Sequence, residues 1–297
     1  MNIYTIVILE QDGGSCVDLK SLAREHSASY MQNPKVEAVL LGGSVSRNWQ
    51  DEYSDIELMV LWKESPTEED RKRPIHLANG DIIDFYPYEE EEWSETYVAQ
   101  GVKFEISNFL TSTIQKIIKE VTLEWETDLN KQCLVAFVHE GIPLGGEEVI
   151  QLLKEKVKVY PAELSKAMIR KNMDLGNRWS NREALLVRED WLMLYKVIVS
   201  TQEKIMGMLF GLNRLYVHHP AFKWQNLSLE KMPIVPENIS SRMTSILMEH
   251  PTKGVRDLEV LMGQVYELIQ TEYPEMDVME VMEKTLFIRP KNVVDSI

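Results

Sequence analysis

Residues 41–60 read LGGSVSRNWQDEYSDIELMV, and the order of residue types in this stretch decides the fold that we expect. The chain leaves an apolar run, turns on Gly-Gly-Ser, crosses a polar loop, and enters a second apolar run that carries Asp55 and Glu57. Successive side chains of a strand point to opposite faces, so these two carboxylates are expected on one face. They repel each other unless a positive charge lies between them, and a hard divalent cation such as Mg²⁺ takes such oxygen ligands.

The glycine turn predicts the other half of a site. Gly42 and Gly43 let the backbone approach a phosphate group closely, and successive N–H groups in such a turn form an anion-binding concavity. Ser44 adds a hydroxyl donor. Arg47 is close enough in sequence to contact a phosphate, and an exposed surface role suits it equally well.

A third carboxylate is needed if two metal ions are held. Asp84 is the preferred candidate, because it lies between the apolar residues of the next expected strand. Glu105, in KFEIS, is a weaker substitute. A lone aspartate at such a position is more often a strand-end polar residue, and only the company of Asp55 and Glu57 favours a functional role.

The chain divides by its pattern into two parts, for which we expect an α+β fold. Strand-length apolar runs occur at residues 36–41, 56–62, 81–88, 101–109 and 132–141. Helices are expected at 18–33, 110–126, 190–212 and 255–269, and Asn79-Gly80 is typical of a hairpin turn. We therefore predict a catalytic domain at 1–155, with a mixed sheet flanked by helices, and an all-α acceptor-binding domain at 156–297.

The combined pattern resembles the nucleotidyltransferase superfamily that includes DNA polymerase β. Its members share Gly-Gly/Ser, then Asp-x-Asp/Glu, then a third acidic residue on a neighbouring strand. The resemblance implies two Mg²⁺ ions held by Asp55, Glu57 and Asp84, with a nucleoside triphosphate, most simply ATP, as substrate. One ion would orient the triphosphate and the leaving pyrophosphate, and the other would activate the attacking oxygen.

Within that superfamily the chain most resembles the kanamycin nucleotidyltransferase-like enzymes, which add AMP to aminoglycoside antibiotics. The resemblance is carried by SDIELM, GDIIDFYPYEEEE and EGIPLGGEEVIQLL at residues 54–59, 80–92 and 140–153. In KNMDLGNRWSN, alignment on Trp179 puts Asp174 at the place of the general base and Arg178 at that of a phosphate contact. Their i, i+4 spacing would put both on one helix face, where a surface ion pair is an equally open interpretation. The family has the longer Glu where this chain has Asp174, which shortens the reach to an acceptor.

Segments 210–220 and 222–224 also look like helical-domain segments of related transferases. There Lys223 would approach the nucleotide. His218 and His219 are expected to be loop residues rather than metal ligands.

Composition limits the partners. The hydrophobic share of 44% and the charged share of 27% are those of a soluble globular protein, and Cys16 and Cys133 lie too far apart for a zinc or disulfide framework. The net charge of −15 disfavours nucleic acid and weakly favours a cationic small molecule, although solubility alone accounts for it more simply. The opening MNIYTIVILE lacks the features of a signal peptide, and no window is long and apolar enough for a membrane span, so we expect a cytoplasmic protein.

The sequence thus predicts Mg²⁺-dependent transfer of AMP from ATP to a hydroxyl of a small molecule. Two alternatives stay open: a nucleotidyltransferase that modifies a protein target, as toxin systems do, and a non-catalytic nucleotide-binding protein. The absence of a basic stripe counts against RNA as the target. A homodimer is expected only by analogy with relatives whose site is completed across a dimer.

Overall fold

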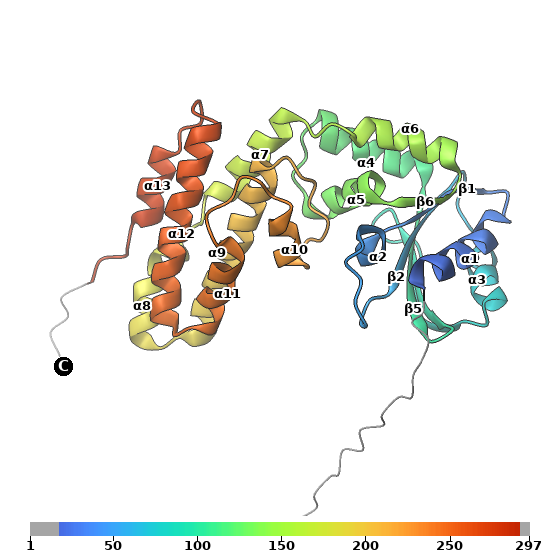
Figure 1. Cartoon of the computed structure of the whole chain (residues 1–297), viewed down its shortest axis with the longest axis horizontal. Coiled ribbons are helices and arrows are strands. Elements are labelled where there is room, and N and C mark those ends of the chain that lie inside the picture. The colour runs from blue at the N-terminus through green and yellow to red at the C-terminus, as the bar shows by residue number, and fades with distance from the viewer. Residues whose placement is uncertain (1–17, 292–297) are drawn as a thin grey trace, which may run out of the picture. The chain divides into compact units, whose positions relative to one another are not determined.

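A computed structural model describes residues 18–291 of the chain, which has an α+β fold (Figure 1). The opening apolar run at 1–10 and Cys16 lie outside the described residues. The strands are β1 (Val36–Leu41), β2 (Ile56–Trp62), β3 (Asp81–Phe85), β4 (Trp93–Ala99), β5 (Val102–Leu110) and β6 (Ile142–Gly145). The helices are α1 (Leu19–Met31), α2 (Gly43–Arg47), α3 (Glu68–Leu77), α4 (Thr111–Leu123), α5 (Leu129–Glu140), α6 (Glu147–Val157), α7 (Ala162–Met173), α8 (Arg182–Arg188), α9 (Trp191–Leu212), α10 (Gln225–Glu230), α11 (Ile239–Met248), α12 (Pro251–Glu272) and α13 (Met279–Leu286).

The chain forms two compact units. The first comprises the described residues up to Asn108 together with Ile142–Gly146, and the second comprises Phe109–Gly141 and the chain from Glu147 onward. The sequence-based division at residue 155 differs from this grouping, because α4, α5 and α6 are grouped with the later helices.

The first unit is built on a six-stranded sheet with the strand order β3-β4-β5-β2-β1-β6. The pairs β3–β4, β4–β5, β1–β2 and β1–β6 are antiparallel. The two runs of the opening stretch therefore lie side by side, with Leu41 opposite Leu58. Both strands are almost wholly buried, as continuous apolar runs predict. Helix α1 packs on β1, β2 and β6.

Side-chain caps define the helices of this unit. Asp18 accepts hydrogen bonds from the backbone N–H groups of Lys20 and Ser21, so α1 begins where its cap predicts. A capping box joins Thr67 and Asp70 at the start of α3. The expected hairpin turn at Asn79-Gly80 is wrong: Asn79 takes a left-handed conformation just after α3, and the Gly80 N–H donates to a helix carbonyl, which ends the helix.

The sequence does not predict strand β4, because one of its buried positions carries a charged residue. The inward residues of Trp93–Ala99 include Glu95, which is fully buried and forms an ion pair of 2.8 Å with the equally buried Arg71. Asn108 donates to the other oxygen of Glu95 and accepts from the indole N–H of Trp62. The buried pair is thus held by a connected polar network.

The expected strand at 132–141 is wrong, since these residues lie in helix α5. An apolar run of this length fits either structure, and the side chain of Asp128 decides it by accepting from the Lys131 N–H at the first turn. The helices expected near 18–33, 110–126, 190–212 and 255–269 are confirmed as α1, α4, α9 and α12.

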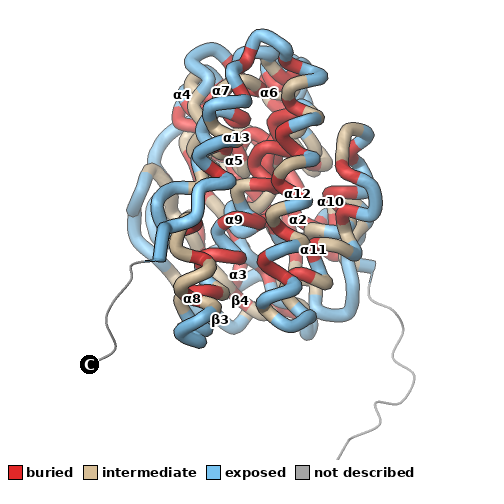
Figure 2. The backbone as a smooth tube through the Cα atoms, turned by 90° about the vertical axis from the view of Figure 1, so that its left-hand side faces the viewer, coloured by how far each residue is buried: buried red, intermediate tan, exposed pale blue. Residues whose placement is uncertain are grey.

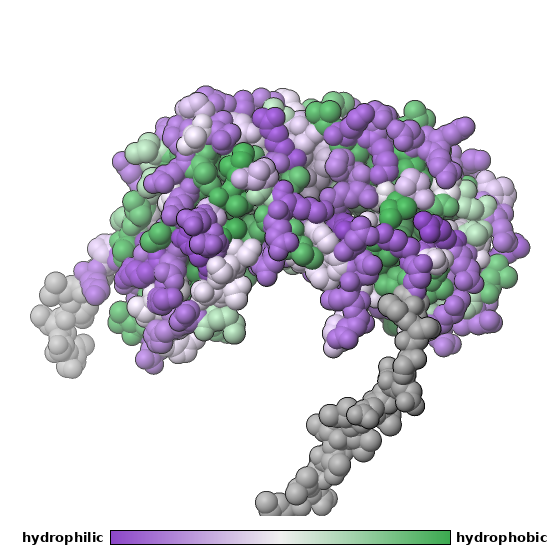
Figure 3. Space-filling model, in the orientation of Figure 1, coloured by the Kyte–Doolittle hydropathy of each residue, from purple (hydrophilic) through white to green (hydrophobic). Residues whose placement is uncertain are grey.

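The second unit is helical. Its longest helices, α9 and α12, bury most of the apolar residues that recur at helical spacing (Figure 2), and α9 packs mainly on α7. Figure 3 shows hydrophilic residues over most of the visible surface, with apolar residues in small groups. No helix within residues 18–291 combines the length and apolarity that a membrane crossing requires.

A buried histidine gives the first unit a pH-dependent stability. His26 is 4% exposed and stacks on Phe104, its Nδ1 lies 3.2 Å from the Tyr97 hydroxyl, and its Nε2 has no partner among the described residues. Burial lowers the pKa of His26 below 6.5. The unfolded chain therefore binds a proton first as the pH falls, and this contribution to stability is present above about pH 6.5 and lost below it.

We expect the free energy of unfolding to fall less between about pH 7.5 and pH 5.5 in His26→Phe than in the wild type. Urea denaturation at the two pH values measures this difference. The exposed His76 provides the control, because His76→Gln should keep the wild-type dependence. An unchanged dependence in His26→Phe would contradict the assignment.

Candidate functional site

The glycine turn and the carboxylate strand meet in the first unit. The Gly42 N–H donates to the backbone oxygen of Glu57 at 2.9 Å, which fixes the turn against β2. Gly43 begins α2 with φ of +62°, a conformation that favours glycine. A Cβ added to Gly43 would overlap the carboxylate of Glu57, so this side chain occupies the space that the missing side chain leaves.

Other residues of the turn form hydrogen bonds with one another. The Arg47 guanidinium donates to the Gly43 oxygen at 3.0 Å and lies over the ring of Trp49. Ser44 is buried, and its backbone oxygen accepts from the Trp49 N–H. Ser46 donates its hydroxyl to the Gly43 oxygen. Gly43 is therefore contacted by three side chains: Ser46 and Arg47 donate to its backbone oxygen, and the Glu57 carboxylate fills the space where a Cβ would lie.

A lysine lies between two carboxylates beside the start of β2. The Lys103 ammonium is 3.1 Å from Asp55 and also forms an ion pair with Glu105, two residues along β5. The hydrogen bond to Glu105, assisted by Asp55, raises the pKa of Lys103 above its ordinary value. Asp55 and Glu105 thus converge on a single cation, which the chain itself supplies.

Asp84 does not lie beside this group. Sequence analysis places it on the strand next to Asp55 and Glu57, but β4 and β5 separate β3 from β2. Three strand spacings amount to about 14 Å, which is beyond the reach of an aspartate side chain. The register puts Asp84 opposite Thr96 and Thr96 opposite Glu105, so Glu105 is the acidic residue of that row nearest to β2. Asp84 therefore does not form the predicted triad with Asp55 and Glu57.

Carboxylate oxygens are the ligands that Mg²⁺ prefers, and Asp55 and Glu105 already share a cation, so their chemistry fits a hard metal ion. Glu57, two residues after Asp55 in the sequence, lies on β2. Within residues 18–291 the side chains of Asp, Glu, His and Cys form no group of three that is arranged to hold a metal. Occupation by a metal would require the Lys103 ammonium to move aside.

Asp174 and Arg178 are not on one helix face. Helix α7 ends at Met173, and the Asp174 carboxylate accepts from the Gly176 N–H at 2.8 Å in a turn that Gly176 makes with φ of +70°. Asp174 lines a cavity of about 380 Å³, whereas Arg178 lines a different one of about 310 Å³. The expected helical i, i+4 pair is wrong, because a glycine able to adopt positive φ breaks the helix between the two residues.

Lys223 is exposed, and its ammonium lies 5.7 Å from the centre of the Trp224 ring. His218 and His219 are loop residues, as expected: the His218 ring contacts the Lys223 oxygen, and the His219 ring accepts from the Ala221 N–H. The structure gives these histidines structural partners within their own loop.

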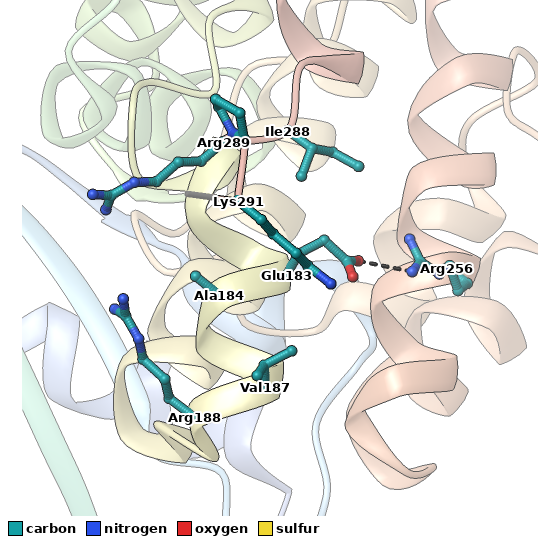
Figure 4. A pocket seen from close by; sticks show the side chains of 9 residues that line it. Glu183, Ala184, Val187, Arg188, Arg256, Ile288, Arg289 and Lys291 are labelled. Atoms are coloured by element: carbon teal, nitrogen blue, oxygen red, sulfur yellow. Dashed lines mark ion pairs between the residues drawn. The ribbon is translucent and has the colours of Figure 1, made fainter. Parts of the chain in front are cut away.

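A further cavity in the second unit, of about 680 Å³, lies between α8, α12 and residues 288–291 (Figure 4). Glu183 and Arg256 form an ion pair of 2.8 Å across it, and the side chains of Arg188 and Arg289 extend toward the same side of the view. Its exposed cations are paired in part with acidic neighbours such as Glu259.

The sequence pattern does not single out Lys103, and it favours Asp84 over Glu105. The available signal was the alternation in VKFEIS, where Lys103 and Glu105 share one face and apolar residues the other. Without the strand order, nothing shows that β5 rather than β3 lies next to β2.

Comparison with known proteins leaves the family open. Residues 125–225 match a family described as "Domain of unknown function (DUF4037)", which is about a third of the chain. No curated protein matches. A nucleotidyltransferase-like protein from Exiguobacterium sibiricum 255-15 is structurally similar over 90% of this chain and 78% of its own, at 12% identity and a TM-score of 0.41. A similarity this low assigns no function.

The contact between Gly43 and Glu57 makes a direct prediction. We expect Gly43→Ala to lower the free energy of unfolding by more than about 1 kcal/mol. Alanine is strained at a positive φ, and its Cβ would also displace the Glu57 carboxylate. Gly101→Ala is the matched control, since Gly101 has φ of +77° with open space around it. Alanine there is strained by the positive φ alone and displaces no side chain. Equal losses in the two variants, measured by urea denaturation, would mean that the Glu57 contact contributes nothing.

Proposed function

We propose that this protein is a Mg²⁺-dependent nucleotidyltransferase that transfers AMP from ATP to a hydroxyl of a small molecule. The observation that carries the proposal is the contact of the glycine turn with the carboxylate strand, where Glu57 fills the space left by Gly43. A glycine turn that lies against an acidic side chain is suited to a ligand that is a phosphate bound to a divalent cation.

Asp55, Glu57 and Glu105 would hold the metal, with Glu105 in the role that sequence analysis gave to Asp84. Bound Mg²⁺ would polarise phosphoryl oxygens and neutralise the charge of the triphosphate. Lys103 pairs with both Asp55 and Glu105 and so holds the two carboxylates close together until the metal displaces its ammonium. Gly42, Gly43 and Ser44 would let the triphosphate approach the backbone.

The acceptor is proposed to be a small, cationic hydroxyl compound of the aminoglycoside kind. The net charge of −15 favours this class, and the chain's resemblance to antibiotic-modifying enzymes suggests it. Asp174 remains the proposed general base, and Arg178 and Lys223 remain proposed phosphate contacts. Asp174 and Arg178 line separate cavities of the second unit.

The test is pyrophosphate release from labelled ATP in the presence of Mg²⁺, with a panel of aminoglycosides and other amino sugars as acceptors. We expect label to appear on an acceptor, and release to require both the acceptor and the metal. A second arm replaces the panel with whole-cell protein, which would reveal the protein-modifying alternative. If ATP neither binds nor reacts with Mg²⁺ present, the proposal fails.

A further inference from the structure

The cavity of about 680 Å³ in the helical unit has no role in the proposed reaction and shares no lining residue with the cavities of Asp174 and Arg178. Helix α8, helix α12 and residues 288–291, which follow α13, form its walls (Figure 4). We call it the arginine cavity. Its volume lies within the roughly 300–1,000 Å³ of pockets that hold small organic ligands.

One buried arginine holds the three walls of this cavity together. Arg182, on α8, is 1% exposed, and its guanidinium donates to the Glu259 carboxylate of α12 at 2.6 Å and to the Phe287 backbone oxygen at 3.1 Å. The Arg289 N–H donates to the Ser180 backbone oxygen at 3.0 Å, which fixes the third wall to the turn before α8. The fold therefore sets the shape of the cavity before any ligand enters, and such preorganisation favours binding.

The lining of the arginine cavity has an excess of positive charge. Its charged side chains are one acid and four cations: Glu183, Arg188, Arg256, Arg289 and Lys291. Glu183 is already paired with Arg256 at 2.8 Å. Arg188 and Lys291 are exposed, and neither forms an ion pair with any residue between 18 and 291. Unpaired cations gathered in one cavity of a chain with a net charge of −15 indicate a local site for an anion.

Arg289 adds donors to this site. Its guanidinium makes one long hydrogen bond, of 3.5 Å, to the Asn181 side-chain oxygen. A guanidinium has five N–H donors, so most of those of Arg289 remain for a ligand. In Figure 4 the side chains of Arg188 and Arg289 come from different walls and extend toward the same side of the view. Planar guanidinium groups of this kind bind the oxygens of carboxylate and phosphate with good geometry.

The arginine cavity also has an apolar part. Val187 is 72% exposed and Ile288 is 40% exposed, and both line the cavity together with Ala184 and Pro290. In Figure 4 the side chains of Val187 and Ile288 extend to the opposite side of the view from the Arg188 guanidinium. Apolar side chains that stay in water beside unpaired cations gain from a ligand that covers them.

We propose that the arginine cavity binds a small organic anion, whose carboxylate or phosphate group contacts Arg188, Arg289 and Lys291 while its apolar body packs on Val187 and Ile288. An inorganic anion would leave the two apolar side chains in water. A neutral apolar compound would leave the cations unpaired. The two halves of the lining thus select a ligand that has both properties.

The experiment is a fluorescence titration with anilinonaphthalene sulfonate, an anionic aromatic probe that brightens in apolar surroundings. Phenylnaphthylamine, which has the same rings and no sulfonate, is the neutral probe. We expect saturable binding of the anionic probe to the wild type. Arg188→Gln/Lys291→Gln should weaken that binding by about tenfold or more, because charged donors are lost, and should leave the neutral probe unaffected.

Competition against the bound anionic probe identifies the chemical class of the ligand. Naphthoate and naphthyl phosphate carry a carboxylate and a phosphate on the same rings, and naphthol carries neither. We expect one of the two anions to displace the probe at a much lower concentration than naphthol does, and the more effective one gives the anion class. Inorganic phosphate alone should displace it poorly, because it cannot cover Val187 and Ile288.

Two further variants make the result specific to this cavity. Lys253→Gln/Lys284→Gln removes the same amount of charge from two exposed side chains of α12 and α13 that do not line the cavity, so it should keep the wild-type affinity. Val187→Ser should weaken both probes, because it shortens the apolar wall. All three variants change exposed side chains, and we expect their melting temperatures to match that of the wild type.

Three outcomes would overturn the proposal. The first is no saturable binding of the anionic probe to the wild type. The second is an affinity that survives in Arg188→Gln/Lys291→Gln, which would place the probe elsewhere, such as at the glycine turn. The third is an equal loss in Lys253→Gln/Lys284→Gln, which would mean that net charge alone attracts the probe. The titration contains neither ATP nor Mg²⁺, so its result is independent of whether nucleotidyl transfer occurs.

Discussion

Glu105→Gln is expected to reduce the proposed Mg²⁺-dependent nucleotidyl transfer by about 100-fold or more, as is the double change Asp55→Asn with Glu57→Gln. Glu105→Gln removes one negative charge from the group of carboxylates beside the glycine turn and the double change removes two, and an amide is a poor substitute for a carboxylate ligand. Steady-state pyrophosphate release, with Mg²⁺-dependent ATP binding measured in parallel, gives the size of both losses.

The same assay separates the sequence-based assignment from the structural one. Asp84→Asn should retain the wild-type rate, because two strands lie between β3 and β2. A large loss in Asp84→Asn with little loss in Glu105→Gln would restore the original triad and contradict the strand order. Circular dichroism of each variant checks that the fold is intact.

Glu95→Leu is the second change for which we expect a large effect, a loss of about 3–5 kcal/mol in the free energy of unfolding. The leucine would leave the Arg71 guanidinium buried without its carboxylate partner, and Asn108 would lose an acceptor. Urea denaturation followed by fluorescence measures the loss.

A double variant identifies the cause. Arg71→Met/Glu95→Leu should recover much of the stability, since a buried ion pair replaced by apolar residues is often near neutral. The exposed pair Lys72–Glu68 provides the control, and Glu68→Leu should leave the unfolding midpoint almost unchanged. If the double variant is no more stable than Glu95→Leu, the cost comes from lost packing rather than from an unpaired charge.

The sequence predicts what depends on local pattern. The strands of the opening stretch and the cap of α1 follow from apolar runs and from Asp18, and each is observed where the pattern indicates.

Pairing between distant strands was not inferable. The charged Glu95 interrupts the apolar pattern of β4, so the sequence does not predict this strand. Without β4 the position of β3 in the sheet is undetermined. Asp84 was therefore predicted as the third metal ligand instead of Glu105. The same limit applies to Lys103, whose partner Asp55 comes from the segment just before β2, far from Lys103 in the sequence. In the second unit a single residue, Gly176, breaks the helix on which the pairing of Asp174 and Arg178 depended.

The strand order also gives Asp84 a different significance. An outer strand exposes unsatisfied backbone groups that can recruit another chain, and charge, proline or short length discourages this. β3 is one outer strand, its residues are largely exposed, and it carries Asp81 and Asp84. β6, the other, has four residues and contains Pro143. Both margins of the sheet thus carry features that oppose aggregation through strand addition, and the aspartate taken for a metal ligand is one of them.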